Sequence, residues 1–268
     1  MFNFVHIDEK WFYMTKKSET YYLLPTEEEP LRTCQRKNYI GKVMFLVAMA
    51  RPRFDRNGNE TFSGKIGVFP FVKMVQAQRR SRNRDVRTLE MKPITSVTRE
   101  IIREFLIKEV IPAITNVWPR DNPDEVIYIQ QDNARTHVDP NDTYFLMATS
   151  SSGLNIQLIC QPPNSPDLNI LDLGFFSAIQ SLQYKESLKT VEELVQAVVK
   201  SFNDYPSQKV NHVWLTLQLC MHETLKQEGE NRFKIPHIRK LKLERDGQLP
   251  TQISCDPQVL ENIINILG

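Results

Sequence analysis

Three aspartates in separate short motifs are the residues of this chain best suited to chemistry. They are Asp8 in VHIDEKWF, Asp132 in IYIQQDNARTH and Asp172 in PPNSPDLNILDLGFF. Asp8 and Asp132 follow apolar runs, where a charged carboxylate costs free energy unless another group compensates its charge. Mg²⁺ is a hard cation that takes oxygen ligands, so it suits a carboxylate site without a histidine or cysteine cluster. The pattern therefore predicts one divalent-metal site built from the three aspartates.

A mixed α/β fold is predicted to position these residues. Apolar runs bounded by turn residues predict strands over 1–14, 20–24, 42–49, 65–75, 126–132 and 156–160. Apolar residues at helical spacing predict helices over 98–117, 173–184, 191–202 and 210–226, and a short helical or loop region at 144–148. Ser96 is available as the N-cap of the first helix, and Asn57-Gly58 predicts a turn. The alternation of strands and helices after residue 98 favours parallel pairing.

This arrangement gives a reason for the three carboxylates to meet. In a strand over 126–132, Tyr128, Gln130 and Asp132 point to one face, and Asp132 emerges at the carboxyl end. Asp8 holds the corresponding place on the first strand, so two adjacent parallel strands would bring both carboxylates together. Asp172 would come from a helix start, which tolerates an acidic side chain. Like charges so placed either raise a pKa or hold a cation between them.

Composition sets broad limits on the class of protein. The 268 residues are 41% hydrophobic and 25% charged, as in an ordinary globular protein of one or two domains. The net charge of +2 is too small to attract a polyanion by itself, so any nucleic-acid binding must come from local patches. No secretory leader or membrane-length apolar run is seen, and we expect a soluble cytosolic or nuclear protein without a membrane partner.

Two basic stretches are candidates for contact with a polyanion. The first, offset by Asp85 alone, consists of Arg79, Arg80, Arg82, Arg84 and Arg87. We predict DNA-backbone contact there, because arginines beside phosphates release counterions; a solvated loop is the alternative reading. The second contains Lys234, Arg239, Lys240 and Lys242 and has the same two readings. Neither stretch contains a sequence-reading motif.

The three acidic motifs, in this order, resemble the catalytic (DDE/D) domain of Tc1/mariner-type DNA transposases, most closely the plant mariner-like group. Thirty-nine residues separate Asp132 from Asp172, which is the spacing of that group. KVMFLVAMARPRFD and SGKIGVFPF add to a resemblance that covers nearly the whole chain. It implies an RNase H-like domain over 1–204, with a mixed five-stranded sheet flanked by helices, followed by a mainly helical C-terminal extension over 205–268.

The resemblance also implies site residues and cofactors. Asp8, Asp132 and Asp172 would hold two Mg²⁺ or Mn²⁺ ions, one activating the nucleophile and the other stabilising the leaving oxygen. Asn133, His137 and Asn169 would orient ligands, water or phosphate. For His137 a purely structural hydrogen bond is the alternative, and His6 is predicted to be a satisfied interior group.

The expected function is metal-dependent DNA cleavage and strand transfer in the nucleus, on transposon ends and target DNA, by a homodimer. Only seven residues precede Asp8, so we expect the N-terminal helix-turn-helix region of the family to be absent. The alternative is a catalytically inactive, transposase-derived protein that binds nucleic acid or a protein partner.

Overall fold

The computed structural model describes residues 1–15, 24–28, 40–80, 85–122 and 124–267. The strand predicted over 20–24 falls outside these residues, except for Leu24, which is in no strand. Within the described ranges, no helix is long and apolar enough to cross a membrane.

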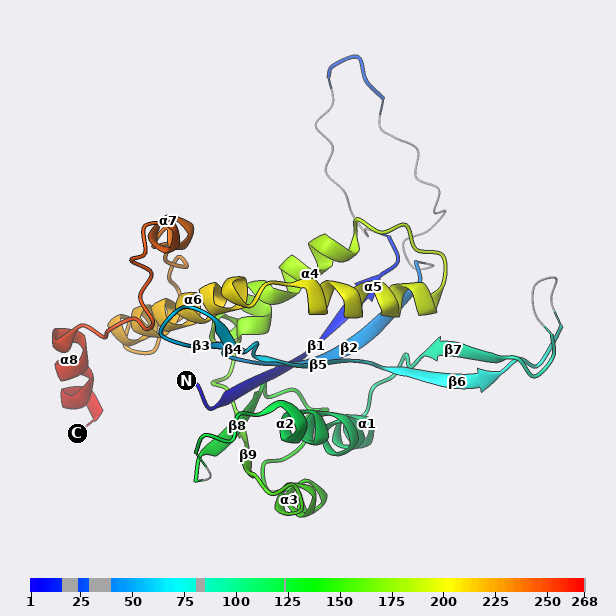
Figure 1. The fold of residues 1–268 in the computed structure, drawn as a ribbon, viewed down its shortest axis with the longest axis horizontal. Coiled ribbons are helices and arrows are strands. Elements are labelled where there is room, and N and C mark those ends of the chain that lie inside the picture. Colours follow the sequence, from blue (N-terminus) through cyan, green and yellow to red (C-terminus); the bar gives the residue numbers. More distant parts are fainter. Residues whose placement is uncertain (16–23, 29–39, 81–84, 123, 268) are drawn as a thin grey trace.

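A mixed five-stranded sheet forms the centre of the molecule (Figure 1). Its strands are β1 (Phe4–Tyr13), β2 (Lys42–Ala50), β5 (Lys65–Pro70), β8 (Val126–Gln131) and β9 (Asn155–Cys160). The order is β5-β2-β1-β8-β9, with β1, β2 and β5 antiparallel and β1, β8 and β9 parallel. Parallel pairing of the later strands is therefore confirmed.

Two short hairpins accompany the sheet. β3 (Arg53–Phe54) pairs with β4 (Glu60–Phe62) across the predicted turn, where Gly58 has a φ of 82° that favours glycine. β6 (Val72–Gln76) pairs with β7 (Leu89–Pro93), and this hairpin projects away from the rest of the molecule (Figure 1).

Helices cover both faces of the sheet (Figure 1). One face carries α1 (Arg99–Phe105), the π-helical turn η2 (Leu106–Val110), α2 (Ile111–Val117) and α3 (Thr143–Ser150). The other carries a second π-helical turn η4 (Leu171–Phe175), α4 (Phe176–Gln183), α5 (Val191–Asp204) and α6 (Ser207–Lys226), with the short 3-10 helix η3 (Pro166–Leu168) before η4. α7 (Lys240–Arg245) and α8 (Pro257–Leu267) follow.

The two faces of β1 enter two different cores. Val5 and Ile7 pack against α1, η2 and α2, whereas Phe12 packs against the layer of α4 to α6. Because side chains alternate along a strand, Asp8 projects toward the α4 to α6 layer and Glu9 toward the opposite one. This alternation decides which groups each acidic side chain can meet.

The helix predicted over 98–117 is confirmed, but its start and its middle differ from expectation. Ser96 is not the N-cap: the helix begins at Arg99, and the carbonyl of Thr98 accepts its first hydrogen bond, from Ile102. In the middle, the N–H of Ile111 reaches back five residues to Leu106. The next residue, Pro112, has no N–H to donate and crowds the preceding turn, which accounts for a wider turn at this point.

The elements described beyond residue 204 are helical, as predicted. α6 contributes Val210, Trp214 and Leu217 to the core that also contains residues of β2 and α5. The predicted domain boundary between residues 204 and 205 falls in the loop between α5 and α6 and stays a prediction.

Candidate metal centre

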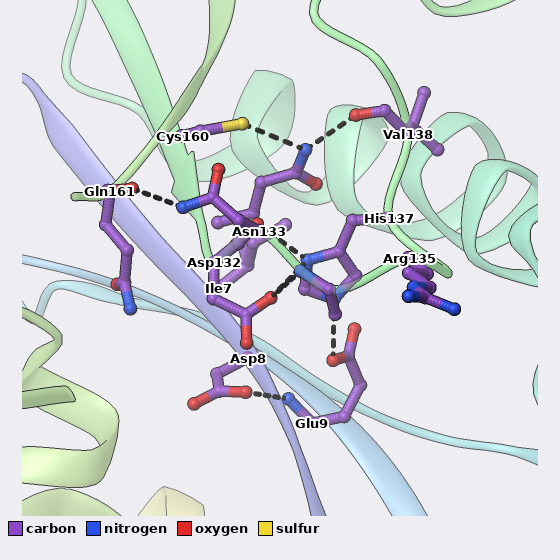
Figure 2. A network of polar contacts seen from close by, with 12 residues as sticks. Ile7, Asp8, Glu9, Asp132, Asn133, Arg135, His137, Val138, Cys160 and Gln161 are labelled. Atoms are coloured by element: carbon purple, nitrogen blue, oxygen red, sulfur yellow. Dashed lines mark hydrogen bonds and ion pairs between the residues drawn. The ribbon is translucent and has the colours of Figure 1, made fainter. Parts of the chain in front are cut away.

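Asp8 and Asp132 lie level with one another across the parallel pair β1 and β8. His6 is in register with Gln130, so continuing two residues along each chain brings Asp8 beside Asp132. Figure 2 shows the two carboxylates pointing toward one another. The expected strand-end position is correct for Asp132, which follows β8 directly, but wrong for Asp8. β1 continues to Tyr13 because β2 pairs with it over its whole further length.

Asp172 comes from the helix start predicted for it, as the second residue of η4. The buried side chain of Asn169 fastens this turn to β1: its Nδ2 donates to the carbonyl of Ile7 at 3.4 Å, and its Oδ1 accepts from the N–H of Leu171 at 3.0 Å. Gln130 adds a link from β8, donating to the carbonyl of Leu168 at 3.0 Å. Asn169 therefore positions Asp8 and Asp172 through the backbone.

Burial, together with repulsion from the neighbouring carboxylates, changes the protonation of Asp8. Burial, followed by the charges of Asp172, Glu9 and Asp132, raises the pKa of Asp8 to about 8, although a hydrogen bond from the N–H of Glu9 opposes this. In the chain without a cation, Asp8 is therefore mostly protonated at neutral pH. A divalent cation would reverse this preference.

Each aspartate uses one carboxylate oxygen for a positioning contact and leaves the other without a partner among the described residues. The three positioning contacts are Asp8 Oδ1 with Glu9 N (2.7 Å), Asp132 Oδ1 with Ala134 N (2.8 Å) and His137 Nδ1 (2.7 Å), and Asp172 Oδ1 with Lys10 Nζ (3.6 Å). The three Oδ2 atoms are thus available to ligands.

These donors fit a hard divalent cation. The available atoms are carboxylate oxygens, the class that Mg²⁺ and Mn²⁺ prefer. Among the described residues, no group of three or more His, Cys, Asp or Glu side chains is already gathered tightly enough to hold a metal ion. The carboxylates form an open site, and Mg²⁺, which keeps several of its waters, suits such a site better than a closed cage.

A buried histidine stands behind Asp132 (Figure 2). The side chain of His137 is 4% exposed; its Nδ1 contacts Asp132 and its Nε2 lies 3.0 Å from Glu9 Oε2. Burial lowers the pKa of His137, but the hydrogen bond and charge of Glu9, and then Asp132, raise it to about 9. The protonated ring donates to both carboxylates, so it holds Asp132 in place and connects it to β1.

Glu9 and Lys10 were not predicted as site residues. Glu9 lies on the opposite face of β1 from Asp8, and its Oε1 is buried with no hydrogen-bond partner in the described part of the chain. Lys10 shares the face of Asp8, where its ammonium pairs with Asp172 and lies 5.3 Å from the ring centroid of Phe176. The signal available in the sequence was the run Asp8-Glu9-Lys10, whose members alternate between the two faces.

Two other predicted residues have structural roles. Asn133 donates to the carbonyl of Gln161 at 2.6 Å, which ties the loop after β8 to the end of β9. His6 is an interior group as predicted, with Nδ1 accepting from the N–H of Ile170 at 3.3 Å and its ring edge-on to Trp214. Burial lowers the pKa of His6 to about 3, so this ring is neutral.

The predicted arginine stretch is not brought to the carboxylates. Arg79, Arg80 and Arg87 belong to the far end of the β6–β7 hairpin, well away from the end of β8 (Figure 1). Arg80 pairs with Asp85 at 3.2 Å, both side chains being about four-fifths exposed (80% and 82%). Arg82 and Arg84 lie outside the described residues.

Comparison with known proteins identifies the fold. No family model matches the chain, and no curated protein matches it. Among solved structures, the Mos1 transposase paired-end complex with left transposon end is 17% identical with a TM-score of 0.58, covering 85% of this chain and 56% of that one. The Mos1 mariner paired end complex with Mn is 16% identical with a TM-score of 0.59, covering 87% and 57%. The Mos1 Strand Transfer Complex is 18% identical with a TM-score of 0.58, covering 87% and 56%.

These similarities show a shared RNase H-like fold, a mixed five-stranded sheet with flanking helices, as predicted. The chain spans just over half the length of the transposase chains it matches.

Proposed function

We propose that this chain is a mariner-type transposase catalytic domain that cleaves and joins DNA strands by divalent-metal-dependent phosphoryl transfer. The observation that carries the proposal is the meeting of Asp8, Asp132 and Asp172 from three separate elements, each with one carboxylate oxygen left without a partner among the described residues. The fold that this chain shares with the Mos1 complexes supports it.

The three Oδ2 atoms would hold the cations. Two bound Mg²⁺ or Mn²⁺ ions would activate a water or a DNA 3′-hydroxyl and would stabilise the leaving oxygen. The rest of the site preserves the geometry of the carboxylates. His137 fixes Asp132, and Asn169 joins the backbone before Asp8 to the turn that carries Asp172.

Lys10 pairs with one of the three carboxylates when no metal is bound. Its ammonium lies beside Asp172 and partly neutralises that carboxylate in the chain without metal. A cation that binds Asp172 competes with Lys10, which is then free to contact a phosphate of the DNA strand. Lys10 thus belongs to the binding machinery in this proposal.

The proposal extends to the biological setting. Transposon-end and target DNA would be the partners, in the nucleus, and a homodimer would bring two ends together. The spacing of Asp132 and Asp172 supports placement in the plant mariner-like group. A transposase-derived binding protein without catalysis is the alternative that the following experiment separates.

The test is metal-dependent nicking of supercoiled plasmid, and joining of a pre-cut duplex end to it, by the purified chain. We expect activity with Mg²⁺ or Mn²⁺, none in EDTA, and a loss of at least about a hundredfold in Asp132→Asn. Asp124→Asn, which removes an exposed carboxylate elsewhere, is the matched control and should cleave like the parent. A folded parent that binds metal but never cleaves, or a variant as active as the parent, refutes the proposal.

A further inference from the structure

A basic cavity lies between α6 and α7, in the part of the chain that the carboxylate site does not use. Its volume is about 650 Å³. The lysines and arginines that line it are Lys209 from α6 and Arg239, Lys240, Lys242 and Arg245 from α7 and the residue before it. Three of these five belong to the second basic stretch of the sequence. The cationic side chains therefore converge on a hollow and do not spread over a flat surface.

None of the described residues that line this cavity is acidic. The structure records no ion pair between any of the five cationic side chains and the described residues. Lys240 Nζ donates to the hydroxyl of Thr216 at 2.6 Å. A hydroxyl group is neutral, so this hydrogen bond does not neutralise the charge of the ammonium. The acidic residue of α7, Glu244, lines a separate cavity beside Arg51, and its carboxylate lies 3.3 Å from His212 Nε2. Because His212 also lines the basic cavity, the Glu244 carboxylate stands at its edge, but none of the five lysines and arginines has an ion-pair partner among the described residues.

The cavity is connected to the carboxylate site through one helix. Val213, on α6, lines the cavity and also lies against η4, since a Cβ on Gly174 would be 3.7 Å from it. Gly174 is two residues beyond Asp172 in the same turn. One helix therefore supports the carboxylate turn on one side and the basic cavity on another.

We propose that this cavity binds the sugar-phosphate backbone of the DNA strand that serves the carboxylate site, an inference that rests on the proposed function. Along α6 the residues that line the cavity run from Lys209 to Thr216, where Lys240 from α7 is anchored. Seven residues of helix span about 10 Å, which is roughly three nucleotide steps along the axis of a DNA duplex. Five cationic side chains around one cavity suit several phosphates, whereas a single small anion would contact only part of them.

The test is DNA binding in EDTA, so that no metal is held at the carboxylates. Lys209→Gln, Lys242→Gln and Arg245→Gln are combined, because all three side chains are exposed and can be changed without disturbing the core. Fluorescence anisotropy with a short duplex should show affinity weakened by about tenfold or more. The slope of log Kd against log salt should fall by about two to three, since each lost phosphate contact removes roughly 0.9.

The matched control combines Lys108→Gln, Lys200→Gln and Lys226→Gln. These lysines are exposed as well, but each has a carboxylate partner: Glu104, Glu186 and Glu223 respectively. The control removes the same total charge and should leave affinity and salt slope close to those of the parent. An equal loss in both triple variants, or no loss in the cavity variant, overturns the proposal.

Inorganic tripolyphosphate separates the two sources of phosphate. If the cavity variant loses binding of tripolyphosphate but not of DNA, the cavity is a small-anion site and the proposal is wrong. Cleavage is measured separately on the same proteins. If the parent never cleaves DNA but the cavity variant binds DNA more weakly than the parent, only the proposed function is rejected. If the parent cleaves DNA and the cavity variant binds DNA as tightly as the parent, only this inference is rejected.

Discussion

Replacing Asp8 by asparagine should stabilise the chain that holds no metal, and increasingly so as pH rises from about 4 to about 8. The pKa of Asp8 is about 8 in the folded chain and about 3.9 in an unfolded one. Between these values the folded chain binds one more proton at this group than the unfolded chain does. The stability from this group is therefore fully present below about pH 4 and is lost as pH rises through about 8. The asparagine of the Asp8→Asn variant has no proton to lose.

The magnitude follows from the same pKa. A rise from the ordinary value to about 8 corresponds to roughly 6 kcal/mol. Water screens part of this repulsion, because the side chains of Asp132 and Asp172 are 41% and 35% exposed. We therefore expect the Asp8→Asn variant to exceed the parent by about 2 kcal/mol at about pH 9 and to equal it at about pH 4.

Urea unfolding followed by circular dichroism in EDTA measures this difference. His137, whose pKa is about 9, titrates in the same range. Its contribution is also lost as pH rises, but it occurs in both chains, so the difference between them isolates Asp8. Adding Mn²⁺ should then stabilise the parent and leave the variant unchanged. If the parent and the variant have the same stability at both pH values, the three carboxylates do not converge.

Lys10→Gln should increase the affinity for Mn²⁺ by about two- to fivefold in calorimetric titration, because it removes the cation that competes for Asp172; weaker metal binding would show that Lys10 supports the site. Glu9→Gln should lower the pKa of His137 from about 9, since Glu9 is the main group that raises it, and an NMR titration still near 9 would reject this role. Asn169→Ala should cost about 2 kcal/mol in urea unfolding, because two buried hydrogen bonds disappear, one to β1 and one within the turn that begins η4. It should also weaken Mn²⁺ binding by about tenfold without touching a carboxylate, and unchanged metal affinity would contradict its positioning role.

Local patterns in the sequence predicted the main elements well. Alternation along 126–131 placed Ile127 and Ile129 in the core and left Asp132 at the strand end. The helix start predicted for Asp172 is present as η4, after a segment in which Pro166 begins the short helix η3. These predictions succeeded because each depends on neighbours in the chain, through side-chain alternation and the missing N–H of proline.

The errors and omissions concern contacts between distant segments. Asp8 was expected at the carboxyl end of its strand, level with Asp132, but it lies in the middle of β1, which pairs with β2 as far as Tyr13. Glu9 was not predicted as a site residue, because the loop after β8 brings His137 against it only in the folded chain. The basic stretch at residues 234–242 gave no hint of a cavity, because α6 supplies the other wall.

The placement of Asp8 on a central strand and of Asp172 on a helical turn has a kinetic consequence. β1 is hydrogen-bonded to β2 along residues 5–13, so its amide protons should exchange only when the whole domain unfolds. The π-helical turn η4 can open locally, with Asn169 as its fastening to β1. We expect a bound cation to leave when η4 opens. The residence time of the cation would therefore depend on the rate of local opening of η4 and not on the stability of the whole domain.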